Sequence, residues 1–283
     1  STVGTYCKCK FKYFLNYVLG LQPVPEEILE LSHMDAGSVF HAVLSDHLGR
    51  GVSLDESLKN HLERYSGSVN KSLFKRRYDQ MFKILTEYVN YDQSEETRAG
   101  RTVFRTELSF GFDTSDYGPL KLTSEICVHG IVDRIDTCED GTLFVIDYKS
   151  GKNPGSAMAE QLILYSMAVE NAFSKENKML SGGEFRLIKG KKKANNFSID
   201  HSSGERKWKF DGKLKFKICE TAEKGKISDE EFIRAVEEII KSIQYGDFSI
   251  ETWKGTASNC YKCENEGIFN ILKWRQKGVP TDG

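Results

Sequence analysis

The sequence predicts an α/β fold in which a mixed β-sheet is flanked by helices and preceded by a helical region. Residues 130–151 contain two strand-like runs joined by a turn signal. Residues 157–173 have the pattern of a strong helix, and another strand-like run follows at 184–188. This order of strand, helix and strand is typical of a crossover between parallel strands.

Length, charge and cysteine content limit the class of protein. With 283 residues the chain can bury a sizeable core, as one elaborate domain or two small ones. Its 40 basic and 41 acidic residues nearly cancel, so any nucleic-acid surface must be a local patch. Seven unevenly spaced cysteines do not resemble a secreted disulfide framework. Because we also find no signal peptide and no membrane-spanning apolar run, we expect a cytoplasmic protein.

The N-terminal part, residues 1–99, is predicted to be helical. Residues 1–20 fit one amphipathic helix, and a second helix is expected from about Asp35 to Gly49. The apolar face of the first helix would carry Phe11, Phe14, Leu15 and Val18. Residues 50–98 continue the helical pattern. An aromatic-rich segment within them fits a packing layer better than an arm that frames a DNA channel.

From Arg101 the pattern changes to that of β-strands. Residues 103–110 alternate between apolar and polar side chains, and residues 116–119 form a turn before the stretch 120–128. Glu107 lies within the first of these strands, and we expect it to be a structural strand residue.

The runs at 131–136 and 143–149 predict a β-hairpin whose loop is residues 139–141. With that loop, Asp133 lies opposite Asp147, and Lys149 shares their face because strand side chains alternate. Two opposed carboxylates repel each other and need a proton or a cation between them. A divalent ion with oxygen ligands meets this need. In the alternative, the hairpin is exposed and its carboxylates pair with Arg134 and Lys149.

A basic segment follows the second strand-like region. Residues 186–219 hold eleven Lys or Arg against three acids, a net charge of +8 in a chain whose total is −1. Lys213, Lys215 and Lys217 alternate with apolar residues, and Trp208 lies nearby. The lysines fit an edge strand protected against unwanted pairing. Together with Trp208 they equally fit a surface that binds single-stranded DNA by phosphate attraction and base stacking.

The C-terminal region begins with a helix from Asp229 to about Tyr245, preceded by a capping Ser228 and closed by Gly246. The tail then carries Cys260-x-x-Cys263.

These motifs resemble the PD-(D/E)XK nuclease superfamily, and within it the RecB/AddB-like exonucleases, the nuclease domains of helicase–nucleases. In family order the chain carries Gly37-x-x-x-His41, Gly130-Ile131-Val132-Asp133, Asp147-Tyr148-Lys149 and Gln161-x-x-x-Tyr165. The resemblance implies a restriction-endonuclease-like core and metal-dependent hydrolysis of DNA phosphodiester bonds.

The resemblance also implies roles for individual residues. His41, Asp133, Asp147 and the backbone carbonyl of Tyr148 would hold one or two Mg²⁺ or Mn²⁺ ions. Lys149 would act with the two Asp residues by orienting water or steadying charge on phosphate. The residues implied to position the DNA are Gln161 and Tyr165. Related nucleases sometimes carry an accessory acid on the strand of Glu107, a role we place second to the structural one.

The cysteines match a metal-cluster motif only in part. Cys9, Cys260 and Cys263 match three of the four cysteines that bind a 4Fe–4S cluster in this branch, but Phe269 occupies the fourth position. Zinc is the other metal that such thiolates suit. We favour loss of the cluster, and we still expect the two terminal regions to meet.

We therefore expect a single nuclease domain over residues 1–283. Its core is residues 100–190, with a basic strand insertion at 191–225 and a C-terminal helix and tail at 226–283. The expected function is a metal-dependent deoxyribonuclease, an exonuclease of DNA repair or recombination. Its expected partners are DNA single strands or duplex ends, and a helicase that is covalently linked or a separate subunit. The alternative is an inactive DNA-binding or helicase-associated domain.

Overall fold

The structure, a computed structural model, describes residues 2–21, 33–64, 71–94, 98–151, 159–200, 206–210 and 226–248. The chain divides into two compact units, one of residues 28–236 and one of residues 1–27 with 237–283. The organisation as a single domain with the parts given above stays a prediction.

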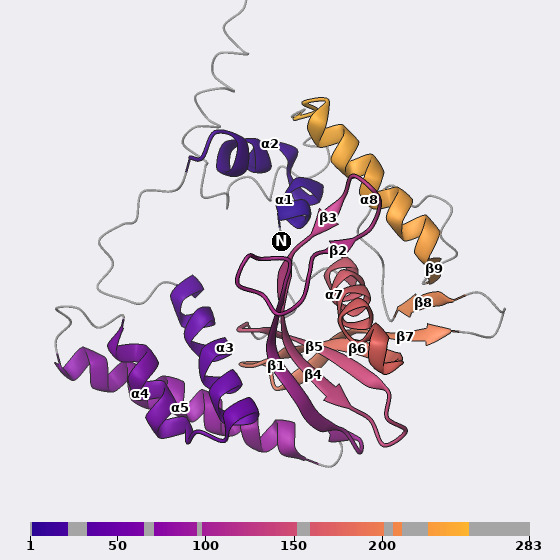
Figure 1. The fold of residues 1–283 in the computed structure, drawn as a ribbon. Coiled ribbons are helices and arrows are strands. Elements are labelled where there is room, and N and C mark those ends of the chain that lie inside the picture. Colours follow the sequence, from indigo (N-terminus) through magenta and orange to yellow (C-terminus); the bar gives the residue numbers. More distant parts are fainter. Residues whose placement is uncertain are drawn as a thin grey trace, which may run out of the picture. The chain divides into compact units, whose positions relative to one another are not determined.

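The larger unit is built on a mixed sheet. Within the described ranges the sheet has seven strands in the order β1-β4-β5-β6-β7-β8-β9 (Figure 1). The strands are β1 (Thr102–Phe110), β4 (Gly130–Thr137), β5 (Leu143–Lys149), β6 (Leu180–Leu187), β7 (Lys192–Asp200), β8 (Lys207–Phe210) and β9 (Lys226–Ser228). Strands β5 and β6 are parallel, and the other neighbours are antiparallel. The predicted mixed sheet is confirmed.

The connection from β5 to β6 is the predicted crossover. It contains α7 (Ala159–Ala172) and the 3₁₀ turn η2 (Ser174–Glu176). A separate two-stranded sheet, β2 (Leu120–Lys121) with β3 (Cys127–Val128), precedes β4. Because side chains of β5 alternate, Asp147 faces α7, whereas its neighbours Ile146 and Tyr148 face the opposite side.

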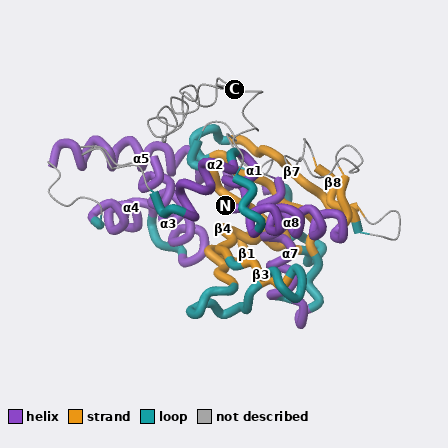
Figure 2. The backbone as a smooth tube through the Cα atoms, turned by 90° about the horizontal axis from the view of Figure 1, so that it is seen from above, coloured by secondary structure: helices purple, strands orange, loops and turns teal. Residues whose placement is uncertain are grey.

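Three helices pack on that opposite side, α3 (His33–Arg50), α4 (Leu54–Glu63) and α5 (Lys71–Gln93). Figure 2 shows α3 between α4 and the strands, and α5 contacts the strands directly through Tyr88 and Asp92. Their apolar residues form one core cluster with Ile146 and Tyr148, and α5 contributes Met81, Leu85, Tyr88 and Val89 to it. The helical region is therefore confirmed, and α5 is the packing layer that its aromatic content favoured.

A buried ionic cluster lies on the same side of the sheet. Arg134 donates to both oxygens of Asp92 at 2.9 and 2.8 Å and to both oxygens of Asp136 at 2.6 and 2.7 Å. Arg186 pairs with Asp92 and with Glu184, and these side chains have almost no exposure. The cluster joins α5 to β4 and β6. It lies on the face of the sheet opposite to the side chain of Asp147.

Trp208 corrects one expectation. It is fully buried, its Nε1 donates to Asp229 Oδ1 at 2.6 Å, and it packs against Phe197. A core position between β7 and β9 leaves no ring face for a nucleic-acid base. Lys213, Lys215 and Lys217 lie outside the described residues, so the two alternatives for the basic segment stay open.

The smaller unit shows a second difference from prediction. The expected single helix is α1 (Thr2–Lys8), α2 (Lys10–Tyr13) and the π-helical turn η1 (Phe14–Val18). Cys9 breaks the helix because its backbone is extended, with φ −158° and ψ 103°, and its Sγ accepts the N–H of Lys12 at 3.3 Å. Phe11 and Leu15 are buried as expected, but Val18 is 49% exposed.

The N-terminal helices contact the end of α8 (Asp229–Gln244) and the residues after it. The hydroxyl of Tyr6 lies 2.7 Å from Ser242 Oγ and donates to the carbonyl of Asp247 at 2.7 Å. Phe248 packs on the rings of Tyr13 and Phe14. The expectation that the terminal regions meet is thus confirmed for this stretch.

The cysteines of the C-terminal tail lie beyond the described ranges. Cys260, Cys263 and Phe269 all belong to that part of the chain, so loss of the metal cluster stays a prediction. Cys9, the N-terminal member of the set, is a free thiol. No helix in the described part of the chain is long and apolar enough to cross a bilayer.

Candidate active site

The hairpin of β4 and β5 sets the register of the site. The N–H of Cys138 donates to the carbonyl of Thr142 at 2.8 Å, and Gly141 takes the left-handed conformation, with φ +81°. The ladder then pairs Thr137 with Leu143 and continues to Arg134 with Ile146. One further step sets Asp133 opposite Asp147, which is the predicted register.

At the end of the ladder, the Asp133 side chain takes the place of a backbone hydrogen-bond partner for β5. Its Oδ2 accepts the backbone N–H of Tyr148 at 2.7 Å, and its Oδ1 lies 3.1 Å from His41 Nδ1. Asp133 is 8% exposed, and Arg134 points to the opposite side of the sheet. The Asp133 carboxylate is therefore held by contacts to β5 and α3. The alternative of an exposed hairpin in which Asp133 pairs with Arg134 does not fit, because Asp133 is buried and Arg134 points away from it.

Asp147 is the centre of a second group of contacts. It is 2% exposed, forms an ion pair with Lys149, and accepts a hydrogen bond from Gln161 Nε2 at 3.0 Å. Gln161 Nε2 also donates to the hydroxyl of Tyr165 at 3.0 Å, one turn along α7. The structure thus brings together Asp147, Lys149, Gln161 and Tyr165 of the last two motifs.

Glu107 joins the site from the neighbouring strand. In the ladder of β1 and β4 its neighbours Thr106 and Leu108 pair with Arg134 and Val132, so Glu107 lies across from Asp133. Its backbone is left-handed, with φ +50°, which is unusual for a residue with a side chain. Glu107, Asp133 and Asp147 therefore form a row of acids across three adjacent strands.

The donor atoms of this site fit a divalent cation. One atom each from His41, Glu107 and Asp133 lie within 4.8 Å of one another. Opposite ligands of an octahedral Mg²⁺ are about 4.2 Å apart, so small side-chain movements would let the three share one ion. Carboxylate oxygens suit Mg²⁺ and Mn²⁺, and an imidazole suits Mn²⁺.

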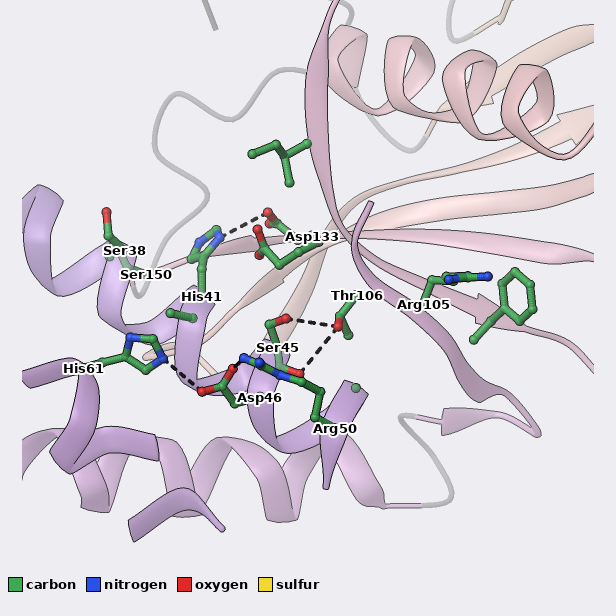
Figure 3. A pocket seen from close by; sticks show the side chains of 16 residues that line it. Ser38, His41, Ser45, Asp46, Arg50, His61, Arg105, Thr106, Asp133 and Ser150 are labelled. Carbon is green, nitrogen blue, oxygen red and sulfur yellow. Dashed lines mark hydrogen bonds and ion pairs between the residues drawn. The ribbon is translucent and has the colours of Figure 1, made fainter. Parts of the chain in front are cut away.

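A cavity of about 1240 Å³ opens on these three side chains (Figure 3). Its lining runs from Gly37 and Ser38 of α3, past the three donors, to Arg50 and Arg105. Asp147, Lys149, Gln161 and Tyr165 are not part of that lining. The cavity therefore gives a ligand access to the side of the site formed by α3 and β1.

The pKa values of Glu107, Asp147 and His41 are all raised, and the negative charge of Asp133 contributes to each rise. Although the Glu107 side chain is exposed, the protein groups around it displace water and raise its pKa to about 7, with a further contribution from the charge of Asp133. Burial, and then Asp133, raises the pKa of Asp147, although Lys149 opposes the rise. Burial acts to lower the pKa of His41, but the hydrogen bond and charge of Asp133 outweigh it, so this pKa is also raised. A cation would relieve the repulsion that these shifts express.

Comparison with known protein families agrees with this arrangement. The model of the PD-(D/E)XK nuclease superfamily matches residues 1–268. The chain belongs to this superfamily. The fold is thus that of a PD-(D/E)XK protein.

Individual relatives of this PD-(D/E)XK chain are ATP-dependent helicase/deoxyribonuclease subunits B. The protein of Lacticaseibacillus casei is 28% identical over 204 residues, which cover 60% of this chain and 17% of the relative. That of Streptococcus agalactiae is 26% identical over 192 residues, covering 63% and 17%. That of Clostridium perfringens is 26% identical over 202 residues, covering 60% and 17%. The chain therefore matches about a sixth of each relative's length.

Prediction and structure differ most at Glu107. His41, Asp133, Asp147, Lys149, Gln161 and Tyr165 lie where the motifs predicted. Glu107, expected to be structural, is part of the candidate metal group. The signal that could have found it is register, because pairing of its strand with residues 130–137 sets Glu107 beside Asp133.

Proposed function

We propose that this chain is a metal-dependent deoxyribonuclease that acts as an exonuclease in DNA repair or recombination. The observation that supports it best is the set of His41, Glu107 and Asp133 donor atoms within 4.8 Å of one another at an open cavity. These residues, with Asp147 and the Tyr148 carbonyl, would hold Mg²⁺ or Mn²⁺. The bound ion would polarise a phosphate oxygen and lower the pKa of a bound water.

Besides the metal ion, the site has a positively charged side chain, that of Lys149. Its ammonium is paired with Asp147 and lies 3.4 Å from Gln161 Oε1, to which it donates. Two anchors restrict a side chain that is otherwise flexible. In this proposal Lys149 orients the attacking water or steadies the charge that develops on the phosphate.

Gln161 and Tyr165 position the substrate strand in this proposal. Tyr165 accepts a hydrogen bond from Gln161, so its own hydroxyl proton is left for another acceptor. Burial raises the pKa of Tyr165, which keeps that proton in place at neutral pH. A phosphate oxygen is the acceptor that such a neutral donor would bind.

We further propose that the chain works with a helicase, as a covalently linked domain or as a separate subunit. The relatives are helicase/deoxyribonuclease subunits of which this chain matches only 17%. Its DNA substrate would then be a single strand or a duplex end that unwinding exposes.

The first prediction tests this function through Asp147→Asn, which removes one charge and keeps the shape. Labelled linear and circular DNA, single- and double-stranded, is incubated with Mg²⁺, Mn²⁺ or EDTA. We expect the native chain to degrade linear DNA with either ion, to spare closed circles and to be inactive in EDTA. Asp147→Asn should lower the rate by about two orders of magnitude or more, because a metal-site group is worth several kcal/mol.

Asp140→Asn is the matched control. It makes the same change at an exposed position in the turn of the same hairpin, where Asp140 Oδ1 accepts from Thr142, and its rate should equal that of the native chain. Binding of DNA without cleavage in any ion would instead favour the inactive DNA-binding domain. Cleavage of closed circles would contradict the proposed exonuclease activity and indicate an endonuclease, because a closed circle has no free end.

A further inference from the structure

Helix α3 crosses the sheet along a single stripe. Gly37, His41, Ser45 and Gly49 are spaced by four residues and so follow one another along a stripe that winds slowly around the helix. Gly37 faces Ser150, which follows β5, since a Cβ there would lie 3.6 Å from Ser150 Oγ. His41 contacts Asp133 of β4. The last two residues of the stripe contact β1.

The contact with β1 is close and specific (Figure 3). Ser45 Oγ donates to Thr106 Oγ1 at 3.0 Å, and Thr106 Oγ1 donates to the carbonyl of Ser45 at 3.5 Å. At Gly49 an added Cβ would lie 2.3 Å from Thr106 Oγ1 and 3.3 Å from Thr106 Cβ and Cγ2. Only a glycine lets the helix approach this strand so closely. We name Ser45, Gly49 and Thr106 the α3–β1 joint.

The joint lies next to two of the candidate metal ligands. On α3, Ser45 is one turn after His41, and on β1, Thr106 directly precedes Glu107. Glu107 has the left-handed φ of +50°, a conformation that neighbouring contacts must hold in place. The distance between α3 and β1 therefore sets the distance between the imidazole and the Glu107 carboxylate.

The joint is not what keeps α3 folded. The opposite face of the helix buries Val39, Phe40, Val43 and Leu44 in the core cluster with α4 and α5. Loss of the joint should thus move α3 relative to β1 without unfolding it. Its specific contribution is the geometry of the site rather than the stability of the helix.

We propose that the α3–β1 joint positions His41 and Glu107 so that both can bind one divalent cation with Asp133. This inference rests on the proposed metal-dependent function. It adds Ser45, Gly49 and Thr106 as positioning residues that themselves touch neither metal nor substrate.

Calorimetric titration of Mn²⁺ into the full chain tests the joint without using activity. Gly49→Ala should lower the Mn²⁺ affinity roughly 10–100-fold, the usual effect of losing support behind a ligand. The melting temperature of the metal-free protein should change little. Adding Thr106→Ala removes Oγ1 and Cγ2 and leaves only the 3.3 Å contact to Cβ, so the double variant should bind Mn²⁺ about as well as Thr106→Ala alone, without the further loss that the clash causes.

Two further variants complete the test. Thr106→Val removes both hydrogen bonds at nearly constant volume and should lower the affinity in the same direction. Gly118→Ala, where a new methyl group would meet nothing within 4 Å, is the matched glycine control and should bind like the native chain.

The outcomes separate the joint from the proposed function. Unchanged Mn²⁺ affinity in both Gly49→Ala and Thr106→Val overturns the joint and leaves the metal site standing. A double variant of Gly49→Ala and Thr106→Ala that binds Mn²⁺ much more weakly than Thr106→Ala alone also overturns it, because the methyl group would then act elsewhere. A native chain that binds no Mn²⁺ overturns the proposed function, and the role of the joint with it.

Discussion

Glu107 shows how one backbone conformation changes the role of a side chain. Its position in the strand was predictable, because the residues around it alternate between apolar and polar. Its left-handed φ was not, since such a conformation costs roughly 1–3 kcal/mol and no feature of the sequence signals it. The register of β1 with β4 sets the carboxylate beside Asp133, in the candidate metal group.

The same residue leads to a prediction about pH. In the metal-free protein the pKa of Glu107 is raised from 4.5 to about 7, and the pKa values of Asp147 and His41 are raised too. Each group therefore binds its proton more tightly when folded than when unfolded. This contribution to stability is complete below the unfolded pKa values and is lost as the pH rises through the folded ones.

The melting temperature of the EDTA-treated protein should accordingly fall as the pH rises from about 4.5 through 7, as far as these groups determine it. Glu107→Gln should flatten this part of the profile, and Glu125→Gln, at an exposed loop position, should not. Saturating Mn²⁺ should reverse the slope, because a cation competes with protons for the same atoms. An identical profile for Glu107→Gln and the native chain would contradict the shift at Glu107.

At the scale of elements, the hairpin was the most predictable part of the molecule. A period of two residues and a three-residue loop together determine which side chains face each other. They set Asp133, Asp147 and Lys149 on one face, and the same alternation sends Arg134 to the other. The helix that carries Gln161 and Tyr165 followed from apolar content and length.

Other elements depended on contacts that no local pattern contains. Trp208 stands between basic residues, as a DNA-binding residue would, but pairing of β8 with β7 and β9 buries it. The apolar pattern of residues 1–20 fits one helix, whereas the extended backbone of Cys9 divides it. Burial within the sheet overrode the local pattern at Trp208, and the backbone conformation of a single residue overrode it at Cys9.

The ionic cluster behind the sheet gives an element-scale prediction. Asp92 of α5 accepts from Arg134 and pairs with Arg186, and all three side chains are fully buried. Asp92→Asn would remove the one carboxylate that Arg134 and Arg186 share and leave each with a single acidic partner, Asp136 or Glu184. Breaking a buried ion pair destabilises proteins by up to about 3–5 kcal/mol. Urea denaturation of the metal-free chain measures this loss.

Glu87→Gln on the same helix is the control for that experiment. Glu87 pairs with Lys191 at 2.9 Å with both side chains exposed, so its loss should hardly change the denaturation midpoint. Equal effects of the two substitutions would mean that α5 does not depend on the cluster.

At the scale of the whole molecule, the candidate site lies entirely in one of the two compact units. His41, Glu107, Asp133 and Asp147 all belong to residues 28–236. The other unit has its own contacts, among them those of Tyr6 with Ser242 and Asp247. A cation bound at the site should therefore stabilise the first unit directly and the second only as far as the two unfold together.

Hydrogen exchange measures this difference. At a free Mn²⁺ concentration about 100 times the dissociation constant, mass action adds about 2.7 kcal/mol of stability to the unit that binds it. Amides of β4 and β5 that exchange only by unfolding should slow by about 100-fold, while those of α1 and η1 keep their metal-free rates. Asp147→Asn should show much less protection, because its weakened site leaves less ion bound. Equal slowing in both units of the native chain would show that they unfold as one, and metal binding at residues 28–236 would then stabilise the entire chain.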